Sequence, residues 1–388
     1  MTAVAITGVG VVSAFGIGVD AFWQGLLEGR SGFVPITRFP APAGARAAQV
    51  NGLDPRTFGR TLLARRIDRT SLLALAACRL ALTDAGGLPP GVTPERTGLA
   101  LGSAFGNFGE TTGFLDRLFT RGVGNPLVFP NLVMSAPLSY ASIELGVTGP
   151  TAFVTELEVS GEGAISCGAE LVADGAVDVC LAGGADELDH VLWEVLGDAG
   201  VLGRGEPRPF APDADGSSPG EGAAVLVLEP LARARARGAR VYARVLPHPG
   251  FGVPAPVHGW PRDARPVAAG LRPLLADVDV IVAAATGQPV LDRLETAALA
   301  GALAGRRVLV TAPRAAIGDF GTAGALGVAA GALAVYAGLV PPTRGDVPSL
   351  APGIEVVHGA ARRAPVRALV VDGLARGGAC RPLRLEAA

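Results

Sequence analysis

Lysine is absent from this sequence of 388 residues, and all 33 of its basic side chains belong to arginine. Charged residues are also scarce, at 18% of the chain, and the formal net charge is only −2. A nucleic-acid-binding surface needs a clear excess of positive charge on one face or stripe. We therefore expect no nucleic acid among the partners of this protein.

Cysteine is rare as well. The four thiols lie far apart in the chain and form no CxxC pair; they are Cys78, Cys167, Cys180 and Cys380. Disulfide frameworks and structural metal sites depend on regularly spaced cysteines, so we expect reduced thiols in the core and no metal ion. The opening MTAVAITGVGVVSAFG has no basic leader and no cleavage site, which predicts a cytoplasmic location.

Long hydrophobic runs are limited to one segment, Gly321 to Val340. A membrane span needs about 20 apolar residues, and this run is long enough. It is rich in alanine and glycine, however, and has no flanking belt of aromatic and basic residues. We therefore expect a close-packed internal helix and no membrane partner.

The remaining composition is that of a globular protein, with 49% hydrophobic residues, 55 glycines and 31 prolines. Strand-like apolar runs alternate with alanine-rich helical stretches such as Arg293 to Ala304, which predicts a layered α/β fold. The expected strands are Val4–Val12, Thr97–Leu101, Thr151–Thr155, Val177–Ala182, Ala223–Leu228, Val241–Val245, Val278–Ala284, Val308–Thr311 and Ala368–Val371. The series divides into two similar halves, which predicts domains at residues 1–240 and 241–388.

Two short motifs carry little weight. GVGVVSAFG follows the first strand, but it lacks the GxGxxG spacing and the later acidic residue of a dinucleotide site, so we expect no nicotinamide or other cofactor. Four arginines cluster near residue 240: Arg233, Arg235, Arg237 and Arg240. We interpret them as a solvated surface, with docking of an acidic carrier protein as the alternative.

Several segments together resemble the β-ketoacyl synthases, the thiolase-like condensing enzymes of fatty-acid and polyketide assembly. The resemblance begins at VAITGVGVVSAFG, continues through NPLVFPNLVMSAPLSYASIELGVTGP, and is clearest in RPFAPDADGSSPGEGAAVLVLEPLARARARGARVYARV. It covers nearly the whole chain. It implies a thiolase-like fold with a duplicated α-β-α-β-α core.

Active members of this family carry a nucleophilic cysteine at a turn between a strand and a buried helix, where the helix N-terminus and nearby amides assist it. Counting from Gly149-Pro150 and checking against Ser160-Gly161, the resemblance implies that Glu158 occupies the nucleophile position. Glu158 cannot carry an acyl thioester. Ser160 has no identifiable histidine base, so we expect a structural or capping role for it.

The two histidines of the family are missing as well. By resemblance, Ala285 lies at or one residue beside the first, in IVAAATGQPVLDRLE, and Asp319 takes the second, in PRAAIGDFGTAGALG, where Arg314 takes the lysine position. The C-terminal turn GLARGGAC has lost the gating phenylalanines and retains Gly377-Gly378. The chain's own histidines have no nucleophile context and are expected near the surface: His190, His248, His258 and His358.

Within the family, this pattern resembles the chain length factors of type II polyketide synthases. These non-catalytic subunits pair with an active ketosynthase, which receives the growing chain from an acyl carrier protein, and close a tunnel at the subunit interface. The resemblance implies a tunnel wall at Phe108, Thr111 and Leu115, with Met134 as a weaker candidate. Ordinary core packing of the same helical stripe is the alternative interpretation.

Two other functions stay open. One is a decarboxylase or acyltransferase of the same fold, with Glu158 and Asp319 as an acid–base pair. It requires perturbed carboxylate pKa values and an open acyl pocket inside this subunit. The other is a self-sufficient homodimeric scaffold, which co-purification with a neighbouring ketosynthase would distinguish. The product, aromatic polyketide or polyene, is not determined by the sequence.

Overall fold

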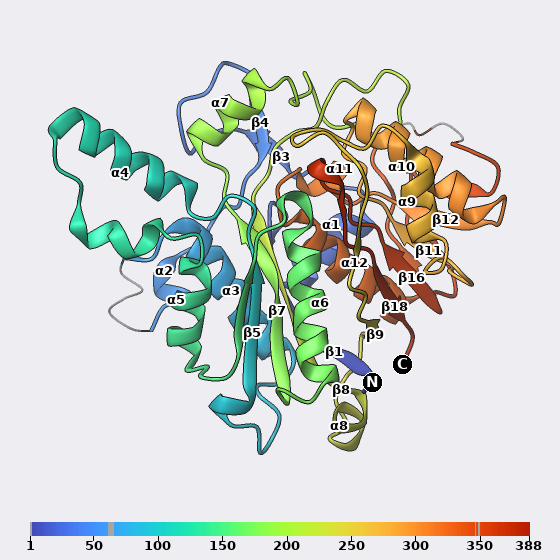
Figure 1. Cartoon of the computed structure of the whole chain (residues 1–388), viewed down its shortest axis with the longest axis horizontal. Helices are drawn as coiled ribbons and strands as arrows, with labels where there is room; N and C mark the ends of the chain where they lie inside the picture. Colours follow the sequence, from blue (N-terminus) through green and yellow to red (C-terminus); the bar gives the residue numbers. More distant parts are fainter. Residues whose placement is uncertain (1, 61–65, 346, 348–349) are drawn as a thin grey trace.

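A computed structural model describes residues 2–60, 66–345, 347 and 350–388. Strands and helices alternate along the chain, as the sequence pattern predicts (Figure 1). Twelve strands form one mixed sheet, with the order β14-β12-β11-β16-β18-β9-β1-β8-β7-β5-β6 and with β2 paired to β1 beside this path. The sheet therefore runs through the whole molecule and contains strands from both predicted halves.

The first half of the sheet has the order β6-β5-β7-β8-β1. Its strands are β1 (Val4–Ser13), β5 (Thr97–Gly102), β6 (Thr151–Val154), β7 (Val179–Asp186) and β8 (Gly222–Pro230). β5 runs parallel to β6 and β7, whereas β8 runs antiparallel to β7 and β1. β6 is the last strand at this edge.

The second half repeats the arrangement in the order β12-β11-β16-β18-β9. Its strands are β9 (Ala243–Leu246), β11 (Val280–Val282), β12 (Val308–Thr311), β16 (Ala368–Val371) and β18 (Leu383–Glu386), with β14 (Ile354–Val356) added at the outer edge. β11 is parallel to β12 and β16, and β18 is antiparallel to β16 and β9. Antiparallel pairing of β1 with β9 joins the halves.

Helices form three layers around the two halves of the sheet. α6 (Ser160–Ala173) and α12 (Ala323–Ala337) lie between the halves, and their side chains share one core with both. α3 (Arg69–Asp84) and α5 (Ala136–Leu145) cover the outer face of the first half, and α9 (Ala264–Leu271) and α10 (Pro289–Leu303) cover that of the second. This is the duplicated α-β-α-β-α core expected from the sequence.

The side chains of β8 point alternately to its two faces, so this strand contributes to two layers of the core. Leu226 belongs to the central core with α6 and α12, whereas its neighbours Val225 and Val227 belong to the core beneath α3. Successive side chains of a strand point to opposite faces, so a strand buried on both faces is apolar throughout. The continuous apolar runs of the sequence reflect this double burial.

The apolar run at Gly321–Val340 becomes α12, which is buried at every position from Ala323 to Val335. Gly324 is needed there because a Cβ atom would lie 1.7 Å from a carboxylate oxygen of Glu162 on α6. Close packing of this kind is typical of an internal helix. Throughout the described ranges, none of the helices combines the length and the apolar character that crossing a membrane requires.

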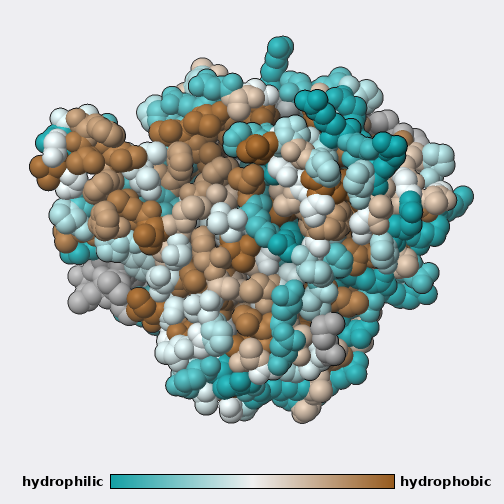
Figure 2. Space-filling model, viewed as in Figure 1, coloured by the Kyte–Doolittle hydropathy of each residue, from teal (hydrophilic) through white to brown (hydrophobic). Residues whose placement is uncertain are grey.

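One arm stands away from the body of the molecule, at the left of Figure 1. It consists of α4 (Phe108–Arg121) and the 3-10 helix η3 (Pro126–Leu132), whose Phe114 and Phe129 rings meet edge to face 6.2 Å apart. No residue of α4 is buried. Large apolar side chains are exposed along the arm and just beyond it, where Figure 2 shows brown atoms: Leu115, Phe119, Val123, Leu127, Phe129, Val133 and Met134.

The remaining elements are short and connect this framework. They are β2 (Gly16–Ile17), β3 (Phe33–Pro35), β4 (Arg46–Ala48), β10 (Phe251–Gly252), β13 (Leu339–Val340), β15 (Arg362–Arg363), β17 (Ala379–Cys380), α1 (Val19–Leu27), α2 (Pro55–Phe58), α7 (His190–Asp198), α8 (Leu231–Ala236), α11 (Arg314–Ile317), η2 (Pro94–Arg96), η4 (Leu157–Val159) and η5 (Arg376–Gly378). Of these, η4, η5 and α7 contribute to the candidate site.

Candidate functional site

The turn between β6 and α6 carries the position that the sequence assigns to a nucleophile. Leu157, within η4, has a φ of 51°, a backbone conformation that residues other than glycine rarely adopt. The hydroxyl of Ser160 closes the turn: it accepts a hydrogen bond from the Glu156 amide at 2.9 Å and donates one to the Leu157 carbonyl at 2.8 Å. Ser160 therefore has the structural role that the sequence predicts.

Glu158 projects from this turn and is 7% exposed. One of its oxygens accepts a hydrogen bond from the Nε of Arg376 at 2.5 Å, and the other accepts one from the Arg376 backbone amide at 3.1 Å. An Nη nitrogen of Arg376 lies 2.5 Å from the carboxylate as well. Both oxygens are thus occupied by a single residue, which comes from the opposite end of the chain.

The two positions that the resemblance assigns to the family's histidines, Ala285 and Asp319, have different surroundings. Asp319 accepts a hydrogen bond from the Nε2 of Gln288 at 3.2 Å. Burial raises the pKa of Asp319, the charge of Arg314 opposes this, and the charge of Glu158 adds to it. Ala285 is fully buried, and its methyl group belongs to the core beneath α9 and α10.

Glu158 and Asp319 line the same pocket, but its free volume is only about 30 Å³. A cavity of that size holds a water molecule or two and no acyl chain. The lining side chains are mostly apolar, and a smaller number are polar: Phe105, Leu157, Leu188, Leu192, Leu196, Val201, Leu202 and Phe320, then Glu158, Ser217, Gln288, Asp319 and Arg376. The sequence did not point to Gln288, which lines the pocket, whereas Ala285 does not.

A second buried ion pair lies behind this pocket and was missed by the sequence analysis. Glu162 of α6 and Arg314 of α11 are 3.3 Å apart, with side chains 0% and 4% exposed. Burial raises the pKa of Glu162 to about 7, although the charge of Arg314 opposes the shift. The signal in the sequence is weak: Glu162 lies among small residues in the first turn of a helix that also contains Glu170.

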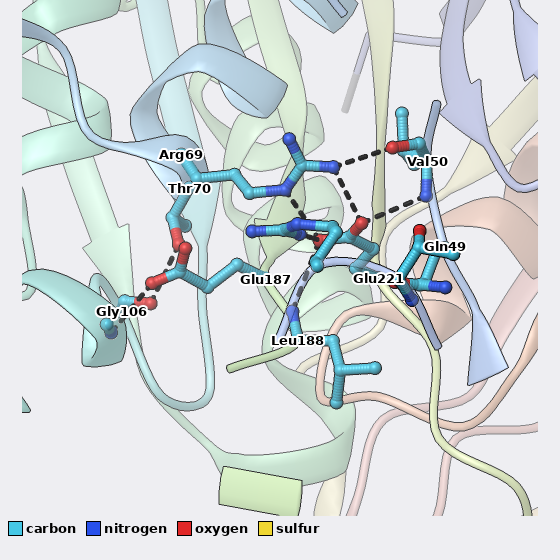
Figure 3. Close-up of polar contacts among 11 residues, drawn as sticks. Gln49, Val50, Arg69, Thr70, Gly106, Glu187, Leu188 and Glu221 are labelled. Carbon is cyan, nitrogen blue, oxygen red and sulfur yellow. Dashed lines mark hydrogen bonds and ion pairs between the residues drawn. The ribbon is translucent and has the colours of Figure 1, made fainter. Parts of the chain in front are cut away.

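Figure 3 shows how Glu221 organises the side of the site nearest the arm. Its buried carboxylate accepts hydrogen bonds from the Arg69 side chain at 2.6 and 2.8 Å, from the Val50 amide at 2.9 Å and from the Leu188 amide at 3.3 Å. Burial acts to raise the pKa of Glu221, but Arg69 and Arg38 outweigh it and the pKa is lowered. The network fixes Leu188, which lines the pocket.

The root of the arm is held by the neighbouring residues in the same view. The hydroxyl of Thr70 donates to the Gly106 carbonyl at 2.9 Å, and the carboxylate of Glu187 accepts from the Gly109 amide, in the first turn of α4, at 2.9 Å. Negative charge is favourable at a helix N-terminus. The start of α4 is therefore fixed to the body, whereas the rest of the helix projects from it.

The predicted tunnel residues lie on this arm and its root, away from the pocket of Glu158. Phe108 and Thr111 are half-buried, Leu115 is 40% exposed and Met134 is 39% exposed. Met134 packs against the loop before α4, where a Cβ at Gly106 would lie 3.3 Å from its Cγ. Because α4 has no buried residue, the stripe is open to a partner, and its role in a tunnel stays a prediction.

The other candidates form no second site. His190 pairs with Glu194 at 3.1 Å, and no histidine of the described chain lines the pocket of Glu158. Three of the clustered arginines, Arg233, Arg237 and Arg240, form ion pairs with carboxylates of the same chain. Within the described ranges, no group of histidine, cysteine, aspartate and glutamate residues is arranged to hold a metal ion.

Models of two protein families match the chain. "Beta-ketoacyl synthase, N-terminal domain" matches residues 1–234, and "Beta-ketoacyl synthase, C-terminal domain" matches residues 267–345. Among curated proteins, the tetracenomycin polyketide synthase ketoacyl synthase alpha subunit of Streptomyces glaucescens is 34% identical over 412 aligned residues, which cover 97% of this chain and 95% of that protein.

Solved structures agree with these matches. The ishigamide ketosynthase/chain length factor superimposes with a TM-score of 0.92 at 29% identity, covering 100% of this chain and 99% of the other. A beta-ketoacyl synthase from Burkholderia phymatum STM815 superimposes with a TM-score of 0.89 at 25% identity, covering 100% of both chains. These likenesses confirm the thiolase-like fold that the sequence resemblance predicts.

Proposed function

The chain belongs to the beta-ketoacyl synthase family, and from this premise we propose that it is a non-catalytic chain length factor of a type II polyketide synthase. It pairs with an active ketosynthase, which receives the growing chain from an acyl carrier protein. One observation carries the proposal: Arg376 engages both carboxylate oxygens of Glu158, the residue that the sequence resemblance assigns to the nucleophile position.

The chemistry of the pocket supports a loss of catalysis. Thioester exchange needs a thiolate, and decarboxylation of a malonyl group is assisted by polarising groups such as histidine. In the described part of the chain, the pocket contains neither cysteine nor histidine. The reaction would have to take place in the partner subunit, where a cysteine and two histidines are expected.

The free edge of β6 supports the pairing with a ketosynthase. Backbone carbonyls of Pro150 and Val154 accept hydrogen bonds from the β5 side, from Leu99 and Ser103. On its other side β6 has no paired strand among the described residues. An exposed edge strand is a template for pairing with another chain, and we place the interface with the ketosynthase at this edge, along Thr151–Thr155.

The arm supplies a second exposed surface, which is apolar. Phe119 is 81% exposed, Val123 64% and Phe129 62%. Exposed apolar patches of this kind mark protein interfaces, and obligate interfaces commonly bury more than about 2,000 Å². The stripe of Phe108, Thr111 and Leu115 would then face the partner and close the far end of the acyl tunnel.

The alternative, in which Glu158 and Asp319 act as an acid–base pair, requires that both line one pocket, and they do. It also requires a free carboxylate and space for an acyl group. Glu158 makes three contacts with Arg376, and about 30 Å³ of free volume remains. These two observations favour the non-catalytic function.

The proposal is tested by co-expressing the chain with the ketosynthase encoded beside it. We expect a stable heterodimer on size-exclusion chromatography. Incubation with labelled acyl carrier protein and intact-mass spectrometry should place the acyl group on the ketosynthase only. A stable acyl adduct on this chain, or a chain that stays monomeric beside its ketosynthase, would contradict the proposal.

A further inference from the structure

The pocket of Glu158 has the form of a site for an amphipathic ligand but lacks the space for one. Its lining combines apolar side chains such as Leu188, Leu192 and Leu196 with polar ones such as Ser217 and Asp319. Small-molecule sites commonly combine an apolar wall with a few polar groups that orient the ligand. The free volume of about 30 Å³ is too small for any alkyl chain.

Arg376 has the longest side chain among the residues that line this pocket. Its side chain is 23% exposed, lines the pocket and reaches the carboxylate of Glu158. An arginine stem is aliphatic and packs well against apolar walls, while its guanidinium needs a polar partner. Glu158 supplies that partner at the end of the pocket, so the two residues fill both the apolar and the polar part of the site.

The loop that carries Arg376 is held in place independently of this ion pair. The Gly377 amide donates to the Gly259 carbonyl at 2.9 Å, and β10 pairs with β17 directly after the loop. Gly378 has a φ of 89°, and a Cβ atom there would lie 2.0 Å from the Val253 carbonyl oxygen. Removing the Arg376 side chain therefore leaves the backbone in position and empties the pocket.

We propose that the side chain of Arg376 blocks a binding site for an alkyl or acyl chain in this subunit. Its ion pair with Glu158 holds the arginine in the blocking position. The inference rests on the proposed function in one respect: a closed pocket here leaves the growing chain only the tunnel at the interface with the ketosynthase. Loss of the thiol and closure of the pocket are then two separate barriers to acylation of this chain.

The test measures access to the pocket directly. Ser217 lines the pocket and is 2% exposed, so Ser217→Cys places a thiol in the pocket lining. Alkylation of this thiol by iodoacetamide is followed by peptide mass spectrometry. With Arg376 present we expect slow alkylation of position 217. Adding Arg376→Ala should increase the rate at least tenfold, and decanoate should slow it again by occupying the opened site. Glu158→Gln, which retains the arginine but removes its charged partner, should give an intermediate rate.

Two controls distinguish opening of the pocket from unfolding. Arg381→Ala removes the neighbouring ion pair with Glu156, outside the pocket, and should leave alkylation of position 217 unchanged. Cys180 is 0% exposed and reports global opening. Equal alkylation of position 217 with and without Arg376, a parallel rise at Cys180, or an absence of protection by decanoate would each overturn the proposal. The labelling is done on the full chain, alone or in its complex, so its failure leaves the heterodimer test unaffected.

Discussion

Two glutamates in the centre of this protein are each paired with an arginine. Glu158 is engaged by Arg376, and Glu162, one helical turn further on, is paired with Arg314. A buried carboxylate is costly unless hydrogen bonds or an opposite charge compensate for lost hydration. Each glutamate therefore requires its arginine, and the stability of the central helix α6 depends on residues far away in the chain.

The Glu162–Arg314 pair gives a prediction for stability. Arg314→Ala leaves a buried carboxylate without its partner, which typically costs about 3–5 kcal/mol. Arg362→Ala breaks a pair whose side chains are 49% and 58% exposed and should cost less than about 1 kcal/mol. Urea unfolding at pH 8, where Glu162 is ionised, measures both. An equal decrease in the free energy of unfolding in both variants would contradict the larger cost expected for breaking the buried pair.

Glu187 predicts a pH dependence. Burial raises its pKa from 4.5 to about 7, although the hydrogen bond from the Gly109 amide opposes the shift. Between pH 4.5 and about pH 7, Glu187 is ionised in the unfolded chain and protonated in the folded chain. The free energy of unfolding therefore falls as pH rises, by about 3 kcal/mol in total. Above about pH 7 this contribution levels off.

Glu187→Gln mimics the protonated side chain and should remove this dependence. We expect its stability to match that of the parent protein at pH 5 and to exceed it at pH 8, by up to about 3 kcal/mol on the same reasoning. Urea denaturation at the two pH values measures the difference. Glu28→Gln is the control, because the side chain of Glu28 is 59% exposed. A constant difference between Glu187→Gln and the parent at both pH values would contradict the raised pKa.

Among the elements, β6 and α4 are incompletely covered. β6 has one free edge, and α4 has no buried residue. The central helices α6 and α12, by contrast, are enclosed in the core. The proposal places β6 and α4 at the interface with the ketosynthase, where that partner would cover the free strand edge and the exposed apolar side chains.

Product length tests the assignment of the α4 stripe. Phe108→Ala removes a side chain at the proposed end of the tunnel and should give longer products at a similar turnover. Thr111→Phe fills volume and should give shorter ones. Reconstitution with the ketosynthase and carrier protein, followed by mass spectrometry of the products, measures both.

The controls for this experiment use the geometry of α4. Arg117 lies nine residues after Phe108, about 180° around a helix of 3.6 residues per turn, so Arg117→Ala should leave product length unchanged. Heterodimer yield is measured in parallel, since a large-to-small change in packed surroundings costs about 3–5 kcal/mol. An unchanged product distribution from well-formed heterodimers of both stripe variants would make the stripe ordinary packing surface.

At the scale of the whole molecule, the two halves repeat one strand order but do not form separate cores. α6 and α12 belong to a single core with strands of both halves, and β1 pairs with β9 across the boundary. The division at residue 240 remains a prediction about sequence organisation. The packing indicates that neither half buries its central face alone.

This packing predicts the behaviour of fragments. Residues 1–240 expressed alone should expose the α6 face that α12 covers, and should leave Glu162 buried without Arg314 or exposed by local unfolding. We expect no cooperative thermal transition by circular dichroism, and recovery of one when residues 241–388 are co-expressed. A cooperative transition of the first fragment by itself would show that the halves are independent domains.

The sequence by itself determined the layered α/β pattern, because the spacing of apolar residues along a strand or helix indicates which of its faces are buried. The expected strands agree with the observed ones to within a few residues at their ends; β12, at Val308–Thr311, matches exactly as predicted. The expected internal helix at Gly321–Val340 is α12. The assignment of Glu158 to the nucleophile position, counted from Gly149-Pro150 by resemblance to the family, stays a prediction.

Only the tertiary structure decided what those residues touch. Arg376 follows Glu158 by 218 positions and Arg314 follows Glu162 by 152, and no local pattern encodes such pairings. After β11, the side chain of Gln288 lines the pocket, whereas that of Ala285 lies in the core beneath α9 and α10. Periodicity is local, whereas charge compensation and cavity volume depend on residues brought together by the whole fold.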